Sequence, residues 1–324
     1  MKKTTLLLAT LGVTALALFV LWNTVSSSNP TDTSTQANDH ITVSTTISPL
    51  QDIAAHIAGK NIAVNVVLPP GASPHTFEIT PSVLREMQGV DVIYSIGYGL
   101  DDWASDLAAS QGTDVVIVDK NVALKSEAED EEDAHEENDD HEEGDHEEEE
   151  EDSHGHGETD PHYWLSISNA EQIAKTISAD LSERYPEMRK KFEANLTEYL
   201  EALSQTHTEI DNLLDGIENK NLITFHDAWF YFADEFDLTI VGTFEPSAGR
   251  EPTPKYLAEL TQALKTAQTS TIFSEPQFGT ANLEAFAADN QLNIVELDPI
   301  GGVEGRDSYI DLMLFNARTI VENN

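Results

Sequence analysis

The sequence predicts an α/β fold of two lobes, each a mostly parallel four-stranded sheet flanked by helices, joined by one long rigid helix. Short β-branched runs alternate with segments of helical periodicity, which is typical of parallel sheets because each crossover needs a helix. The alternation occurs twice, before and after one long helical pattern at residues 186–215. The length of 324 residues is also typical of about two domains.

The N-terminal lobe is expected over residues 41–185, including an acidic loop at 120–160. Its four strand-like runs are ITVSTTI, IAVNVVL, DVIYSIG and DVVIVD. The helical patterns between them are PLQDIAAHIAG, PSVLREMQG and DWASDLAAS, and Gly59 and Gly89 stand where helices are expected to end. A further helix is expected at residues 168–184, after the acidic loop.

The linking helix is predicted at residues 186–215, where Pro186 suits the first helical turn and Gly216 suits the end. About 30 residues at 1.5 Å each give roughly 45 Å, which is enough to span two lobes. The C-terminal lobe, residues 216–324, repeats the alternation with the strand-like runs NLITF, LTIVGTF, TIFSE and NIVELD. Each of these runs leads into a helical pattern, the first of them at residues 228–236.

The N-terminal segment, residues 1–27, is expected to be a signal peptide or an uncleaved anchor. Lys2 and Lys3 precede an apolar run of 17 residues, 6–22, which is long for a signal peptide and short for a membrane span. The polar residues 28–40 are expected to be a disordered linker. The absence of Cys excludes a lipidated Cys anchor, disulfides and thiolate metal ligands. We therefore expect a protein secreted into the periplasm.

The net charge of −42 is concentrated in one segment, because residues 126–160 hold 21 of the 59 acidic residues and no Lys or Arg. This charge argues against nucleic acid and against anionic membrane surfaces as partners, and it favours a cation. Five histidines lie in the same segment: His135, His141, His146, His154 and His156. We hypothesise that the loop holds divalent metal ions weakly and assists their capture; a passive solubilising loop is the alternative.

Three other histidines stand in loops beside predicted elements. His75 and His226 each follow a strand, and His162 precedes a helix, while Asp298 and Glu275 also stand at strand ends. Sites in parallel sheets form at the carboxyl ends of strands. Three neutral imidazoles and one carboxylate suit Zn²⁺, whereas two of each suit Mn²⁺ better. The sequence therefore predicts a metal site in which position 226 matters for selectivity.

Six segments, in order, resemble those of the zinc-specific ABC-transporter substrate-binding proteins, in the cluster A-I metal-binding family. They are LPPGASPHTFEITPS, DPHYWLS, FHDAWFYF, EPTPKYLAEL, SEPQFG and LDPIGG. The resemblance covers about residues 41–324, including the long helix and the His- and acid-rich insertion. It implies two α/β lobes around a rigid helix, with the metal between them. It also implies a membrane permease and its ATPase as partners, and Zn²⁺ as the transported ligand.

The resemblance implies His75, His162, His226 and Asp298 as the metal ligands. Relatives selective for manganese carry Glu where His226 stands, so the histidine here favours zinc. In some relatives the fourth ligand differs or is water, so that position stays open between Asp298, Glu275 and water. Glu275 is expected to support the site rather than to bind the metal itself.

The expected function is high-affinity capture of Zn²⁺ in the periplasm by a monomer, which delivers the ion to the permease of an ABC importer. A periplasmic zinc buffer or adhesin and a manganese-binding member of the same family are the alternatives. A zinc hydrolase is disfavoured because the chain has no HExxH, no Gly-rich phosphate loop and no nucleophile elbow, so we expect no enzyme. Because a histidine must be neutral to bind metal, affinity should fall as the pH drops through roughly 6.5.

Overall fold

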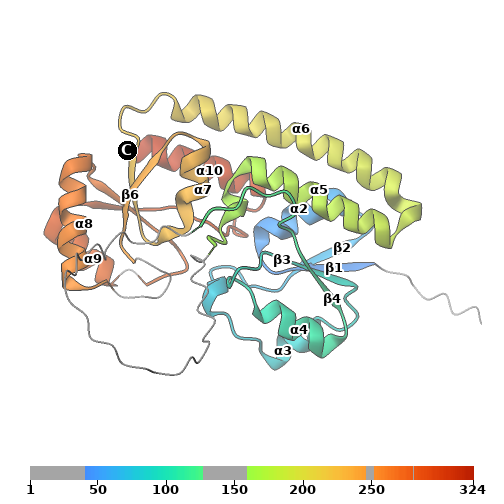
Figure 1. Ribbon diagram of the computed structural model, residues 1–324. Coiled ribbons are helices and arrows are strands. Elements are labelled where there is room, and N and C mark those ends of the chain that lie inside the picture. The colour runs from blue at the N-terminus through green and yellow to red at the C-terminus, as the bar shows by residue number, and fades with distance from the viewer. Residues whose placement is uncertain (1–40, 127–158, 246–251, 280) are drawn as a thin grey trace, which may run out of the picture. The chain divides into compact units, whose positions relative to one another are not determined.

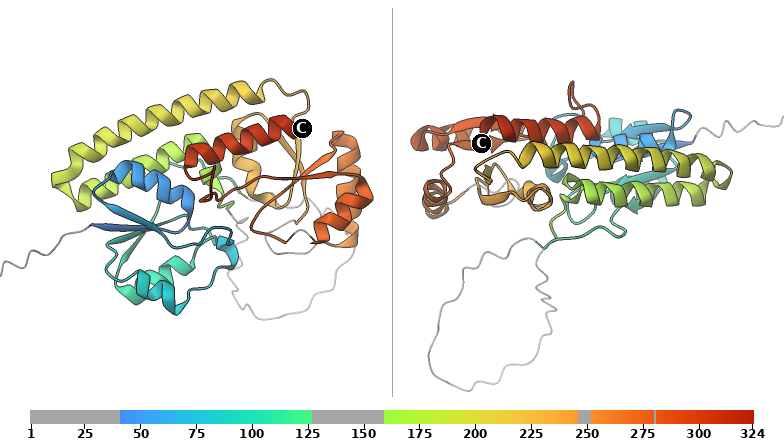
Figure 2. Two further views of the ribbon diagram at one scale, coloured as in Figure 1. Left: turned by 180° about the vertical axis from the view of Figure 1, so that it is seen from behind. Right: turned by 90° about the horizontal axis from the view of Figure 1, so that it is seen from above.

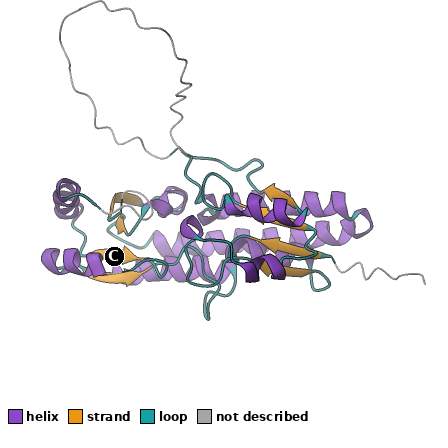
Figure 3. Ribbon diagram, turned by 90° about the horizontal axis from the view of Figure 1, so that it is seen from below, coloured by secondary structure: helices purple, strands orange, loops and turns teal. Residues whose placement is uncertain are grey.

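The computed structural model describes residues 41–126, 159–245, 252–279 and 281–324. These residues contain two four-stranded sheets, and every strand pair in both sheets is parallel. Helices flank each sheet, as Figures 1 and 3 show. The predicted fold class, two parallel α/β lobes with a long helix between them, is confirmed.

The N-terminal sheet has the strand order β2-β1-β3-β4. Its central strands are the most buried, and β3 has all four residues buried, because parallel sheets are covered on both faces. The strands are β1 (Thr42–Thr45), β2 (Ala63–Val66), β3 (Val92–Ser95) and β4 (Asp114–Ile117). The helices of this lobe are α2 (Ser48–Ala58), α3 (Pro81–Glu86), α4 (Trp103–Gln111) and α5 (Ile167–Arg184).

The C-terminal sheet repeats the same arrangement with the order β6-β5-β7-β8. Its strands are β5 (Asn221–Thr224), β6 (Thr239–Thr243), β7 (Thr271–Ser274) and β8 (Asn293–Glu296). Its helices are α7 (Phe230–Glu235), α8 (Pro254–Ala267), α9 (Ala281–Asn290) and α10 (Tyr309–Asn323). In both sheets the first strand lies second from the edge, so the chain crosses over it to reach the third strand.

The linking helix consists of a 3₁₀ turn, η3 (Pro186–Met188), followed by α6 (Arg189–Leu214). Figure 2 shows α6 running along both lobes. One stripe of the helix is buried, since its apolar residues recur at helical spacing. The buried residues of this stripe are Phe192, Tyr199, Leu203, Thr206, Ile210 and Leu214.

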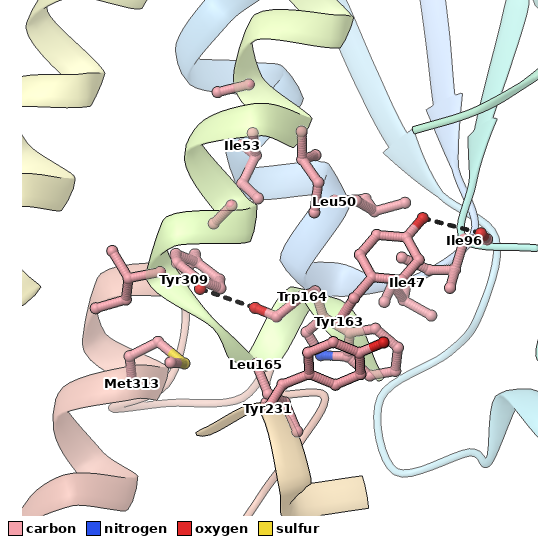
Figure 4. Packing of buried hydrophobic residues seen from close by; sticks show 14 of the residues in the cluster. Ile47, Leu50, Ile53, Ile96, Tyr163, Trp164, Leu165, Tyr231, Tyr309 and Met313 are labelled. Atoms are coloured by element: carbon pink, nitrogen blue, oxygen red, sulfur yellow. Dashed lines mark hydrogen bonds between the residues drawn. The ribbon is translucent and has the colours of Figure 1, made fainter. Parts of the chain in front are cut away.

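The two lobes share one hydrophobic core, and residues 41–324 form a single compact unit. Side chains of the N-terminal lobe, of the 3₁₀ turn η2 (Tyr163–Leu165) and of α10 pack together in it, as Figure 4 shows. The hydroxyl of Tyr309 donates to the backbone oxygen of Trp164 at 2.8 Å, and that of Tyr163 donates to Ile96 at 2.9 Å. Two smaller clusters form the outer cores of the lobes.

Carboxylates also tie each lobe to a helix N-terminus of the other. Glu235 of α7 accepts hydrogen bonds from the backbone N–H groups of Ile167 at 2.6 Å and Ser168 at 2.8 Å, at the start of α5. Asp52 of α2 accepts from the N–H of Tyr309 at 3.0 Å, at the start of α10. Because a helix N-terminus has unpaired donors and a partial positive charge, both contacts stabilise the present arrangement of the lobes.

Several predictions concern residues that the structure does not describe. These are the signal or anchor at residues 1–27, the linker at 28–40 and the five histidines of the acidic loop. The base of that loop is described: Ser126 pairs with Thr159 in an antiparallel bridge, so its two ends lie together. No helix within the described ranges is both long enough and apolar enough to cross a membrane.

Candidate metal centre

The structure brings His75, His162 and His226 together. His75 lies in the 3₁₀ turn η1 (Pro74–Thr76) after β2, His162 immediately precedes η2, and His226 immediately precedes the 3₁₀ turn η4 (Asp227–Trp229) after β5. One ring nitrogen from each lies within 4.8 Å of the other two. The Nε2 atoms of His75 and His162 are 3.2 Å apart. Among the described residues, no other group of three or more His, Asp and Glu side chains meets this criterion.

The three imidazoles line a small pocket with both polar and aromatic walls. His162 and His226 are buried, and His75 is partly exposed. The ring of Trp164 lies 5.3 Å from that of His162, and the ring of Phe278 lies 5.0 Å from that of His226. These aromatic walls pack against the rings of His162 and His226 and shield them from water. The pocket is lined by Ser73, Pro74, His75, His162, Trp164, His226, Glu275, Gln277, Phe278, Pro299 and Ile300.

Asp160 fixes the orientation of His162. One carboxylate oxygen, Oδ1, accepts the backbone N–H of His162 at 2.9 Å and lies 2.8 Å from its ring Nδ1. A proton on Nδ1 leaves Nε2 with a free lone pair, and Nε2 is the atom that faces His75. The sequence patterns gave no signal for this role of Asp160, although the DPH segment places it two residues before a predicted ligand.

Glu275 fixes His226 in the same way, from the end of β7. Its Oε1 lies 2.6 Å from Nδ1 of His226 and accepts the indole N–H of Trp229 at 3.1 Å. Nε2 of His226 is buried and has no hydrogen-bond partner within the described residues. A buried, unpaired imidazole nitrogen is costly, so its presence beside two other imidazole nitrogens fits a metal ligand.

The protonation of the three histidines follows from burial and from these carboxylates. Burial, with a smaller contribution from the neighbouring imidazoles, lowers the pKa of His75 and of His162 to about 3. Burial also lowers the pKa of His226, but the carboxylates of Glu275, Asp227 and Asp160 together outweigh it, Glu275 most of all, so that this pKa is raised above 6.5. Burial raises the pKa of Asp160 to about 7. His75 and His162 are therefore neutral donors at any physiological pH.

Asp298 lies outside the three-histidine group. Its Oδ1 accepts from the backbone N–H groups of Ile300 and Gly301, both at 3.0 Å, and from Nε2 of Gln277 at 3.1 Å. Its Oδ2 lies 3.0 Å from Nη1 of Arg306. Both oxygens therefore have protein partners, and the metal-ligand role of Asp298 stays a prediction.

The family model of the periplasmic component A of zinc-uptake complexes, ZnuA, matches residues 43–323. The chain is 30% identical over 283 residues to the high-affinity zinc uptake system protein ZnuA of Yersinia pestis, an alignment that covers 84% of this chain and 87% of the relative. It is 26% identical over 297 residues to the manganese-binding lipoprotein MntA of Halalkalibacterium halodurans, covering 90% of this chain and 91% of the relative.

Solved structures also match most of the chain. A crystal structure of ZnuA has a TM-score of 0.74 and 26% identity, and covers 88% of this chain and 100% of its own. A ZnuA deletion mutant with zinc bound has a TM-score of 0.73 and 25% identity, and covers 88% of this chain and 98% of its own. Relatives named for zinc and for manganese thus match most of the chain.

Proposed function

The chain belongs to the ZnuA family of periplasmic zinc-uptake components, and on that premise we propose that it captures Zn²⁺ through His75, His162 and His226. It then delivers the ion to the membrane permease and ATPase of an ABC importer. The family is a transport component, and we propose that this member works in the periplasm as a monomer and makes or breaks no covalent bond.

The observation that carries this proposal is the convergence of three imidazole nitrogens from different segments, with Nε2 of His226 buried and unpaired within the described residues. Neutral imidazole is a preferred ligand of Zn²⁺, whereas Mn²⁺ prefers carboxylate and water oxygens. The donor set therefore supports zinc over the manganese named in some relatives. A zinc buffer would need the same site, so the proposed transport role is tested in cells.

We also propose that the acidic loop at residues 120–160 assists capture. The base of this loop lies next to the site. Thr159, which pairs with Ser126, directly precedes Asp160, and Asp160 contacts the proposed ligand His162. Carboxylates and histidines in such a segment hold divalent ions weakly.

Chelator competition on the full chain is expected to reveal one tight zinc site and additional weak ones. A variant with a short linker in place of residues 127–158 should keep the tight site and lose the weak ones. Deleting the gene should slow growth and reduce cellular zinc when zinc is limiting. Reintroducing the gene should restore both growth and cellular zinc. Normal zinc uptake after deletion would argue for a buffer, and tighter binding of Mn²⁺ than of Zn²⁺ would contradict the proposed metal.

Lower pH is expected to weaken zinc binding, because bound protons must leave before the metal binds. His75 and His162, with pKa values of about 3, hold no proton near neutral pH. His226, whose pKa is raised above 6.5, and Asp160, whose pKa is raised to about 7, take up protons as the pH falls. As the pH falls from about 7 to about 5, the logarithm of Kd for zinc should therefore rise by about one to two for each pH unit.

Three histidines with ordinary pKa values would instead give a slope approaching about three. Chelator competition at a series of pH values measures the slope, with a correction for the chelator's own titration. Either a slope near three or an affinity independent of pH would contradict the assignment of these pKa shifts.

A further inference from the structure

We propose that two buried carboxylates outside the ligand set, Asp160 and Glu275, balance the charge of the bound metal, and that Asp298 serves as a structural ion-pair partner of Arg306 and does not bind the metal. This inference rests on the proposed function, because it assigns roles around the same site.

Three neutral imidazoles leave the two positive charges of Zn²⁺ uncompensated. A buried net charge is costly unless an opposite charge lies nearby. Asp160 and Glu275 are only 3% and 2% exposed, and each has one oxygen within hydrogen-bond distance of the Nδ1 atom of a proposed ligand. Together they supply two negative charges, which equals the charge of the ion.

The second oxygen of each carboxylate supports this role. Oδ2 of Asp160 and Oε2 of Glu275 are buried and have no hydrogen-bond partner within the described residues. An ionised carboxylate in this state is destabilised unless a positive charge is near, and the bound metal would provide that charge through the imidazole. Asp227, next to His226, is only partly buried and makes no hydrogen bond to a ligand ring among the described residues, so it is a weaker candidate.

The surroundings of Asp298 argue against direct metal binding. Asp298 is only 1% exposed. Its carboxylate contacts the side chains of Arg306 and Gln277 and accepts hydrogen bonds from the backbone N–H groups of Ile300 and Gly301. The guanidinium of Arg306 also contacts Glu296 at 2.8 Å and the ring of Phe315 at 4.6 Å, which fixes its position. To reach the metal, Asp298 would have to leave this partly buried ion pair and its three hydrogen bonds, which is unfavourable.

Asp298 is also unnecessary for charge balance. A third carboxylate beside Asp160 and Glu275 would make the occupied site negative. Without it, the three histidines leave a fourth coordination position for water, and such an open position suits an ion that must later be released.

The test compares Asp160→Asn, Glu275→Gln and Asp298→Asn in the full chain. We expect Asp160→Asn and Glu275→Gln each to weaken zinc binding by about 10- to 100-fold. Asp160→Asn should not lower the melting temperature of the metal-free protein, because it removes a buried, incompletely paired charge. For Glu275→Gln the same is expected above the raised pKa of His226, where that imidazole is neutral and no ion pair is lost. A merely structural role would lower that temperature. Asp298→Asn should do the opposite: a lower melting temperature, with zinc affinity within about threefold of the wild type.

Two further measurements address coordination and folding. The absorption spectrum of bound Co²⁺ should be the same in the wild type and in all three variants, because none of them changes a ligand. Arg306→Gln removes the same ion pair but keeps Asp298, and it should also lower the melting temperature without changing zinc affinity. It therefore gives an answer even when Asp298→Asn does not fold.

The charge-balance inference is overturned by wild-type zinc affinity in both Asp160→Asn and Glu275→Gln, or by a changed Co²⁺ spectrum in Glu275→Gln. The inference for Asp298 is overturned by a loss of zinc affinity of more than about tenfold in Asp298→Asn, or by an altered Co²⁺ spectrum in that variant. Failure of the wild type to bind zinc tightly is a separate result, which would overturn the proposed function instead.

Discussion

His226→Ala is expected to weaken zinc binding by more than about 100-fold, because loss of a ligand exceeds the 10- to 100-fold effect of losing a contact outside the ligand set. His226 supplies the buried, unpaired Nε2 that faces the other two imidazoles. Alanine offers no donor, and among the described residues His75 and His162 form no other group of three with an Asp, Glu or His. Chelator competition at pH 7.5 or so measures the effect as a change in Kd.

A loss of zinc binding in His226→Ala has two contributions that must be separated. The substitution also deprives Glu275 of its contact at 2.6 Å, so it should disturb the metal-free protein as well. His75→Ala provides the comparison, since His75 contacts no carboxylate in the described residues and is partly exposed. The zinc affinity of His75→Ala should fall about as much as that of His226→Ala, but the stability of the metal-free protein should change less.

His56→Ala is the matched control for removal of an imidazole. His56 lies on α2, stacks on Tyr199 and has a side chain that is 48% exposed, outside the pocket. Zinc affinity in this variant should equal that of the wild type. Tight zinc binding that survives in both His226→Ala and His75→Ala would place the site elsewhere in the chain.

The sequence predicted the architecture well because short-range patterns encode it. Each of the eight strands in the described part of the chain lies within or at the edge of a β-branched run, and the three histidines stand in loops beside these elements. Element boundaries were less accurate where 3₁₀ turns form. The predicted helix at 228–236 is divided into η4 and α7, and the linking helix begins with η3, whose three residues are followed by α6.

Contacts between distant segments could not be predicted from the sequence patterns. Glu275 and His226 are 49 residues apart, and nothing in either segment specifies that Oε1 and Nδ1 meet. The environment of Asp298 depends on Arg306, which stands in a turn without periodicity. The shared core was equally hidden, because two lobes joined by a helix would give the same alternation of strands and helices with or without it.

Trp164→Ala is expected to destabilise the protein by about 3–5 kcal/mol, the range for removing a large aromatic side chain from a core. Trp164 is fully buried, and its indole N–H donates to the backbone oxygen of Pro299 at 2.8 Å. Its ring also forms a wall of the metal pocket beside His162. At about 2–4 °C per kcal/mol for a chain of this size, the melting temperature should fall by roughly 10 °C.

Trp103→Ala is a closely matched control for this prediction. Its indole N–H also donates to a proline carbonyl, that of Pro74, at 3.1 Å. Trp103 is only partly buried, however, and it packs in the outer core of the N-terminal lobe, whereas Trp164 belongs to the core that both lobes share. We therefore expect Trp103→Ala to lower the free energy of unfolding clearly less than Trp164→Ala does.

Denaturant titrations of the metal-free variants, followed by far-UV circular dichroism, measure both costs. Because the lobes share one core, Trp164→Ala should shift a single transition and should not separate the unfolding of one lobe from that of the other. Equal costs for the two tryptophan variants, or two resolved transitions in the wild type, would mean that the lobes are stabilised independently. The histidines would then be held together by the metal rather than by the fold, and the site could not be preformed around its buried imidazoles.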